Sequence, residues 1–262
     1  MAAAAGPDVL AQIDAAQRAL YAAVAPAVVY VVTRDGFGSG VVLGADGLVL
    51  TNAHVVGSAE RVDVVTFAGQ KLTGRVVERG AGTDLAVVQL DGAAGLPVLR
   101  GADASELAVG QWVAAVGHSE GGGWSFTTGA VSNLYTSSTG HAVFQTQIPL
   151  SHGNSGGPVV DHAGRLVGIA TASLERAQNL NFAIRLDVAL LGLTTLEPVC
   201  ECLVVHAPAG VPVFVDGAMV GTGPRVAVPA RAGEHAVFAV IAGRKVERTA
   251  RLPADRVVTL GP

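Results

Sequence analysis

Apolar residues change their spacing near Pro26, and this change separates a predicted helix from a long series of predicted strands. Over residues 8–24 the apolar positions recur at near-helical spacing, and Asp8 stands where an N-cap residue would stand. The apolar positions are Val9, Ile13, Leu20 and Val24. The pattern therefore predicts a short amphipathic helix that ends at the proline.

From residue 28 the apolar residues alternate with polar ones or form short continuous runs, with Gly and Asp-Gly turns about every 8 to 12 residues. This pattern predicts many short strands. A first group is expected at Val28–Thr33, Ser39–Gly44, Leu48–Thr51, Val62–Phe67, Lys71–Glu78 and Leu85–Leu90. A second group is expected at Trp112–Gly117, Phe126–Ser132, Ala142–Gln147, Gly157–Asp161, Arg165–Thr171 and Leu180–Ile184, followed by a short helix at Leu186–Leu193.

The composition agrees with a mainly β protein and excludes some classes of function. Aromatic residues are scarce, whereas Val, Ala and Gly are abundant, as in proteins with many short strands and tight turns. The 17 basic and 21 acidic residues give a net charge of −4, so the sequence has no basic footprint for nucleic acid. No apolar run approaches the roughly 18 residues of a transmembrane helix, so no transmembrane segment is expected.

Three short motifs contain candidate catalytic residues. His54 ends Thr-Asn-Ala-His after an apolar run, Asp84 opens Asp-Leu-Ala-Val, and Ser155 is the serine of Gly-Asn-Ser-Gly-Gly-Pro. A hydroxyl is a poor nucleophile at neutral pH, so acyl transfer needs a base to take its proton and a carboxylate to orient that base. The three residues therefore predict a catalytic triad. Their order along the chain is that of chymotrypsin, not that of subtilisin or the α/β-hydrolases.

The turn around the candidate nucleophile also predicts donors for the oxyanion that forms in acyl transfer. Glycines remove side chains where the chain turns tightly and where a substrate carbonyl group approaches the backbone. We therefore expect an oxyanion-binding segment of Gly153, Asn154 and Ser155, with the N–H groups of Gly153 and Ser155 as its donors.

The segments Gly38–Val56, Asp84–Leu90 and Gly153–Pro158 resemble the HtrA branch of the trypsin-like serine proteases, and the similarity runs over roughly residues 22–190. The resemblance implies a chymotrypsin-like double β-barrel. It also implies a serine endopeptidase that cleaves proteins or peptides through an acyl-enzyme. A second function stays open, in which the chain is a catalytically idle adaptor that keeps the protease fold to bind partners.

The resemblance also implies a pocket for P1, the substrate residue before the scissile bond. Residues 148–152, which precede the nucleophile turn, contain no carboxylate that could select Lys or Arg. The expected pocket residues are Leu150, Ala170, Thr171 and Ala172. These side chains imply a small or medium aliphatic P1 residue, with a graded preference because one methylene is worth only about 1–3 kcal/mol.

Residues 200–262 predict a separate small β-sandwich. Their strand-like segments are Leu203–Val205, Pro212–Gly217, Arg225–Val228, Ala236–Val240 and Val257–Leu260. The stretches Ala207–Pro224 and Ala230–Val237 resemble the PEGA domain, a bacterial β module usually attached to envelope or surface proteins, which implies a possible envelope partner. An Ig-like or fibronectin-like appendage stays open. The expected organisation is an N-terminal helix over 1–26, a protease domain over 27–195 and a β module over 200–262.

The C-terminal segment departs from the HtrA pattern, because HtrA enzymes normally carry PDZ domains and no PDZ-like carboxylate-binding loop is visible here. The segment Leu134–His141 is also short compared with the sensor loop of the family. Regulation by peptides at a PDZ site is therefore not expected.

The remaining polar residues predict neither a metal site nor another cofactor. The histidines lack metal-ligand spacing, and Cys200 and Cys202 lack a second pair for zinc, so we expect two free or partly oxidised thiols. No export signal is visible, which favours the cytoplasm, whereas the PEGA resemblance favours the bacterial envelope if a leader has been removed. Both compartments stay open.

Overall fold

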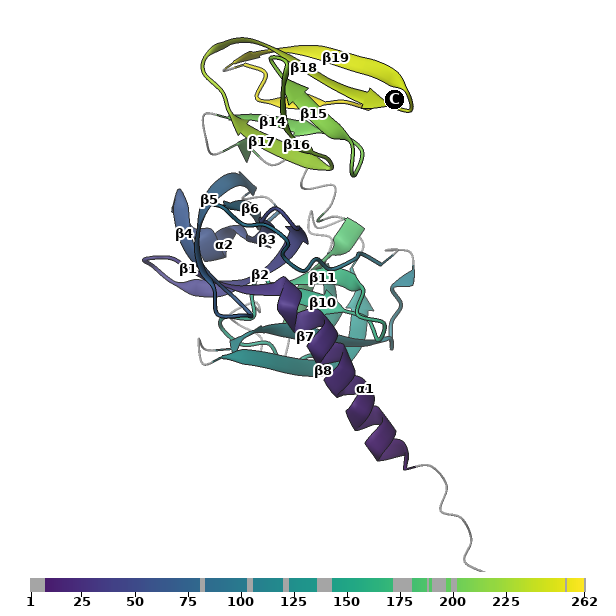
Figure 1. Cartoon of the computed structure of the whole chain (residues 1–262). Coiled ribbons are helices and arrows are strands. Elements are labelled where there is room, and N and C mark those ends of the chain that lie inside the picture. The colour runs from purple at the N-terminus through teal and green to yellow at the C-terminus, as the bar shows by residue number, and fades with distance from the viewer. Residues whose placement is uncertain are drawn as a thin grey trace, which may run out of the picture. The chain divides into compact units, whose positions relative to one another are not determined.

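The computed structural model describes residues 8–80, 83–102, 106–119, 123–135, 143–171, 181–187, 189, 197–198, 202–252 and 254–261. The chain forms two compact units. The first contains residues 1–76 and 80–195, and the second contains residues 77–79 and 196–262. Each unit is described by itself, with the element labels of Figure 1.

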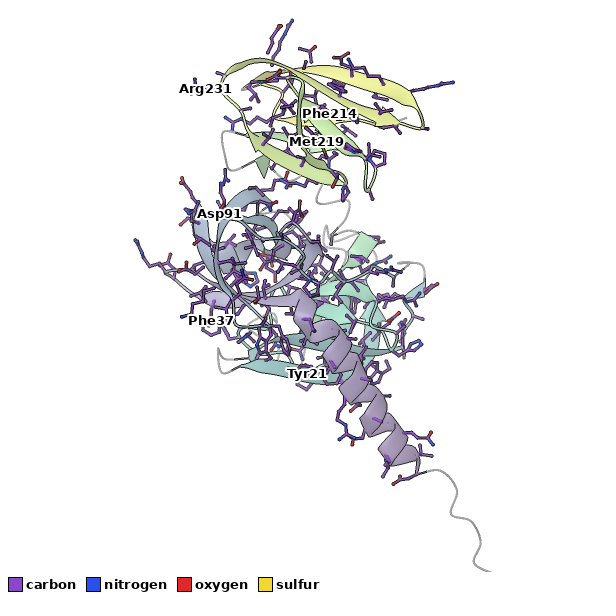
Figure 2. All side chains as sticks on the ribbon, in the orientation of Figure 1. Tyr21, Phe37, Asp91, Phe214, Met219 and Arg231 are labelled. Carbon is purple, nitrogen blue, oxygen red and sulfur yellow. The ribbon has the colours of Figure 1, made fainter. Side chains whose placement is uncertain are left out.

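The predicted N-terminal helix is confirmed as α1, Val9–Val24, with Asp8 as its N-cap. The Asp8 carboxylate accepts hydrogen bonds from the N–H groups of Leu10 and Ala11 at 3.1 and 3.3 Å. Only the C-terminal half of the helix is buried, where its apolar residues pack on the second barrel. Tyr21, which is labelled in Figure 2, contacts Phe67 and Phe126 edge-on, with ring centroids 6.2 and 5.9 Å apart.

The first predicted group of strands forms a closed six-stranded barrel in the order β5-β4-β1-β2-β3-β6, with β5 paired to β6 (Figure 1). A single 3₁₀ turn, Ala25–Ala27, leads from α1 into it. The strands β3 and β6 are buried almost throughout and each contains an apolar run, Leu48–Leu50 and Leu85–Val88, whereas β4 alternates exposed and buried residues along Arg-Val-Asp-Val. The strands are β1 Val28–Val32, β2 Phe37–Gly44, β3 Leu48–Asn52, β4 Arg61–Thr66, β5 Lys71–Gly80 and β6 Leu85–Leu90.

The second predicted group forms another closed barrel, in the order β10-β11-β12-β9-β8-β7. Its interior is apolar, and Phe144, Ile148 and Val159 are fully buried in it. The strands are β7 Trp112–His118, β8 Trp124–Leu134, β9 Val143–Thr146, β10 Pro158–Val160, β11 Leu166–Thr171 and β12 Asn181–Arg185. The chymotrypsin-like double barrel is thus confirmed.

The second unit contains the small β-sandwich predicted from the sequence. One sheet has the order β17-β14-β20 and the other the order β16-β15-β18-β19. Both sheets contribute to one core, in which Leu203, Val213, Val237 and Ala239 are fully buried. The strands are β14 Cys202–His206, β15 Pro212–Val215, β16 Ala218–Thr222, β17 Arg225–Pro229, β18 Gly233–Ile241, β19 Arg244–Leu252 and β20 Val257–Thr259.

This unit also includes a short strand, β13 Glu197–Pro198, which pairs with Glu78 and Arg79 of β5. Glu78 is fully buried, and its Oε1 accepts a hydrogen bond from Nε of Arg225 at 2.8 Å. Burial raises the pKa of the Glu78 carboxyl, while the Arg225 guanidinium acts in the opposite direction. The outer strands β16 and β19 were not predicted from the sequence.

Some sequence predictions fall outside the described residues. Ala172, Cys200 and most of the segment Leu134–His141 belong to this group, as does most of the helix expected at Leu186–Leu193. Among the residues that the structure describes, no helix is both long and apolar enough to cross a membrane.

Candidate active site

The structure places His54 and Asp84 in direct contact. His54 lies in the four-residue helix α2, Ala53–Val56, and Asp84 directly precedes β6. His54 Nδ1 is 2.9 Å from each carboxylate oxygen of Asp84, and the His54 backbone N–H donates to Asp84 Oδ1 at 3.1 Å. Because a carboxylate only accepts hydrogen bonds, Nδ1 carries a proton, and in the neutral imidazole the lone pair of Nε2 is left without a proton.

Contacts from both barrels hold the Asp84 carboxylate and its backbone. The Ala53 N–H and the Asn52 side-chain amide donate to the Asp84 carbonyl oxygen at 3.0 and 2.9 Å. The Thr171 hydroxyl donates to Oδ2 at 2.9 Å. Asp84 has φ of +52°, a left-handed conformation that aspartate tolerates better than most residues. These contacts therefore maintain a backbone geometry that is unfavourable by itself.

The pKa of the Asp84 carboxyl lies below its ordinary value of 3.8. Burial alone would raise this pKa, but the hydrogen bonds and charge of His54, together with the Thr171 hydroxyl, outweigh burial. The carboxylate is therefore ionised at neutral pH, as an orienting group for a catalytic histidine must be.

Ser155 lies in the turn between β9 and β10 and lines the same groove as His54. The groove has a volume of about 820 Å³, and Phe37, Val55, Leu150 and Thr171 also line it. Ser155 is 9% exposed. Its hydroxyl makes no hydrogen bond to His54 among the described residues, and catalytic hydrogen bonds often tighten only when substrate binds.

The three residues of the predicted oxyanion-binding segment differ in whether their backbone N–H already has an acceptor. The N–H groups of Gly153 and Ser155 have no acceptor in the part of the chain that the structure describes. In contrast, the Asn154 N–H donates to the Ser151 carbonyl oxygen at 3.1 Å. The geometry thus leaves the N–H groups of Gly153 and Ser155 free to bind a ligand. Asn154 instead supports the turn through the hydrogen bonds of its side chain.

The Asn154 side chain is buried in a network of hydroxyl groups that the sequence did not indicate. Its Oδ1 accepts from the N–H and the hydroxyl of Ser151 and from the Ser119 hydroxyl, each at 3.0 Å. Its Nδ2 donates to the Ser125 hydroxyl at 3.3 Å. The network ties the turn of the candidate nucleophile to the ends of β7 and β8.

Two positions of the turn require glycine, because the backbone of another segment lies too close for a side chain. Gly153 has φ of +97°, and a Cβ there would lie 1.9 Å from the carbonyl oxygen of His118. Gly156 has φ of +85°, and a Cβ there would lie 2.1 Å from the carbonyl oxygen of Ser39. Any other residue at either position would displace the turn.

The expected pocket residues have different surroundings. Leu150 and Thr171 line the groove, and Thr171 also binds Asp84. The Ala170 side chain lies in the core of the second barrel, while its N–H and carbonyl group bond to Gly157 and Gly156 at 2.9 Å. Ala170 therefore supports the nucleophile turn through its backbone, and Ala172 lies outside the described residues.

Two six-stranded barrels, with His54 and Ser155 at one groove and Asp84 hydrogen-bonded to His54, in the chain order of chymotrypsin, define the class of chymotrypsin-like serine proteases. A family model described as "Trypsin-like peptidase domain" matches residues 38–169. The chain belongs to this family, and within it the chain is HtrA-like.

The curated relatives agree with that assignment. The chain is 39% identical over 163 residues to the protein HhoB of Synechocystis. The aligned segment covers 60% of this chain and 39% of that protein. It is 37% identical to a "Probable periplasmic serine endoprotease DegP-like" of Halomonas elongata, over 60% of this chain and 34% of that protein. The chain thus spans only about two-fifths or less of the length of these relatives.

Solved structures give the same fold. The HtrA-type protease AlgW with a tripeptide superposes with a TM-score of 0.65 and 25% identity, over 90% of this chain and 96% of that chain. Deg5 superposes with a TM-score of 0.60 and 28% identity, over 69% of this chain and 93% of that chain.

Proposed function

We propose that this protein is a serine endopeptidase that hydrolyses peptide bonds of proteins or peptides through His54, Asp84 and Ser155. The observation that carries the proposal is the contact of His54 Nδ1 with the Asp84 carboxylate at 2.9 Å, at a groove that Ser155 also lines. This contact leaves Nε2 of the imidazole free to accept a proton. The similarity to HtrA and DegP proteases supports the same reaction class.

The proposed reaction proceeds by two acyl transfers. His54 Nε2 takes the Ser155 hydroxyl proton as Oγ attacks the carbonyl carbon, and the N–H groups of Gly153 and Ser155 bind the oxyanion. The imidazolium then gives that proton to the leaving amine, and an acyl-enzyme remains on Oγ. Water then attacks the ester while His54 Nε2 takes one of its protons, and the imidazolium returns that proton to Ser155 Oγ as the carboxylic acid leaves. Asp84 stays ionised throughout.

The specificity proposal rests on the charges and sizes of the groove residues. Asp35 is the sole carboxylate among the described residues that line the groove, and it comes from the β1–β2 connection of the first barrel. Leu150 and Thr171 come from the second barrel and offer no negative charge. Leu150 and Thr171 form the described part of the proposed P1 pocket.

We expect a peptide library to be cleaved after Val, Ala or Leu, with kcat/KM at least about tenfold higher than after Lys or Arg, a difference of about 1.4 kcal/mol. Burying a cationic side chain without a carboxylate partner costs several kcal/mol, which is the physical reason. Mass spectrometry of the products measures the preference. A profile dominated by Lys or Arg would reject the pocket, and an uncleaved library would favour the idle adaptor.

We further propose that residues 200–262 are a PEGA-like module that binds an envelope partner. A chain that ends at Thr195 is expected to hydrolyse a short peptide within about threefold of the full chain, because the module contributes no triad residue. Truncation removes Arg225, so both chains should carry Glu78→Gln to avoid an unpaired buried carboxylate. A large loss of kcat/KM in the folded truncated chain would show that the module controls the site.

A further inference from the structure

Ser39 is a fully buried serine of β2 that binds both ends of the turn containing the candidate nucleophile. Its N–H donates to the Ser155 carbonyl oxygen at 2.8 Å. Its hydroxyl donates to the Gly153 carbonyl oxygen at 2.6 Å and accepts from the His118 N–H at 2.9 Å. One residue of the first barrel therefore restrains the two carbonyl groups on either side of Asn154.

We propose that Ser39 is a positioning residue that keeps the Gly153 and Ser155 N–H groups in place for the oxyanion. The inference rests on the proposed function. Gly153 has φ of +97° and no side chain, so its own conformational preferences restrain its carbonyl group only weakly. The Ser39 hydroxyl supplies that restraint from outside the turn.

The residues around Ser39 fix its strand and leave space for its hydrogen bonds to the turn. The Thr51 hydroxyl donates to the Ser39 carbonyl oxygen at 2.7 Å, which fixes the strand that carries the serine. A Cβ on Gly117 would lie 2.9 Å from the Ser39 hydroxyl oxygen, and a Cβ on Gly38 would lie 3.0 Å from the Ser155 carbonyl oxygen. Glycines from two strands thus leave room for the hydroxyl and for the carbonyl groups that it and its N–H bind.

A positioning role differs from simple stabilisation in the step that it affects. Oxyanion donors act most strongly when charge develops on the carbonyl oxygen, so their displacement lowers kcat more than it raises KM. Deletion of a whole donor in such sites costs about 10²–10³ in kcat. Loss of the Ser39 restraint displaces the donors without deleting them, and a smaller loss is expected.

The test compares Ser39→Ala with Thr146→Val in the full chain. Thr146 is an equally buried hydroxyl in the second barrel, and it also donates to one carbonyl oxygen (Ala130) and accepts from one N–H (Ile148), both at 3.1 Å. Ser39→Ala is expected to lower kcat for a cleaved peptide roughly 10- to 100-fold, with KM within about threefold. Binding of a peptide boronic acid, which forms a tetrahedral adduct with the serine, should weaken by the same factor. Thr146→Val should change each quantity less than about threefold.

Equal losses of kcat in the two variants would overturn the proposal, as would a rise in KM with unchanged kcat. Ser39→Cys, which fills the site with a somewhat larger atom but has a weak donor, serves as the second variant if the alanine variant does not fold. If neither Ser39 variant folds while Thr146→Val does, the role of Ser39 is stability and the proposal is wrong. A parent chain that neither cleaves peptides nor binds the boronic acid refutes the proposed function itself, a result distinct from an active parent with unaffected variants.

Discussion

Ser155→Ala is expected to lower kcat for peptide hydrolysis by roughly 10⁵- to 10⁶-fold, because it removes the atom that forms the acyl-enzyme. Binding and the oxyanion donors would still leave about 10³- to 10⁴-fold acceleration over the reaction in water. Peptide hydrolysis measures the loss in kcat. A fluorophosphonate probe, which reacts covalently with an activated serine, measures the loss of the nucleophile directly.

The fold should survive this substitution. The Ser155 hydroxyl makes no hydrogen bond within the described part of the chain, so its removal leaves no new unpaired group. Thermal unfolding of the variant should therefore match that of the parent. Ser58→Ala, at an exposed loop serine, is the matched control and should keep both hydrolysis and labelling. If purified Ser155→Ala cleaves casein as fast as the parent, another residue is the nucleophile.

The barrels could be predicted from sequence because their strands are short apolar runs between strong turn signals. The strand Leu85–Leu90 was predicted with the bounds that the structure has, and α1 was predicted with its N-cap. Each of the other barrel strands differs from the prediction by one or two residues at one end or at both. Such differences arise because a strand ends where its last ladder hydrogen bond is made, which depends on the neighbouring strand.

The outer strand β19 of the β-sandwich was missed because its sequence is mostly polar. β19 has nine residues, Arg-Lys-Val-Glu-Arg-Thr-Ala-Arg-Leu, of which Ala250 is fully buried while most of the charged ones are exposed. Its partner β18 pairs with it along the whole length, from Gly233 opposite Leu252 to Ile241 opposite Arg244. Pairing with a well-formed neighbour therefore makes this segment a strand despite its weak apolar pattern.

The supporting residues of the candidate site were missed for a different reason. The Ser39 hydroxyl bonds to a residue 114 positions away, and the Ser119 hydroxyl to one 35 positions away. Contacts of this kind have no period in the sequence, and Gly-Ser-Gly is common in ordinary loops. The signal that could have suggested them is the density of glycines at Gly38, Gly117 and Gly156, which marks close backbone approach.

Asp84→Asn is expected to lower kcat by about 10⁴-fold while leaving the fold intact. The asparagine amide can place N–H toward His54 Nδ1 and so stabilise the tautomer whose proton is on Nε2, which cannot act as the base. It also removes the negative charge that stabilises the imidazolium. The kinetic measurement is single-turnover hydrolysis near neutral pH, where the Asp84 carboxyl of the parent is ionised because its pKa lies below 3.8.

The pH dependence gives this prediction a second readout. A carboxyl with a depressed pKa contributes stability that is present above its unfolded pKa and is lost as the pH falls through its folded pKa. The parent should therefore be stabilised relative to Asp84→Asn near neutral pH, and the difference should shrink only below about pH 4. Thr171→Val, which removes one hydrogen bond to Oδ2 but keeps the charge, should lose only about tenfold in kcat. If Asp84→Asn loses no more rate than Thr171→Val, the carboxylate charge does not assist the histidine, and Asp84 acts only by holding α2 in place.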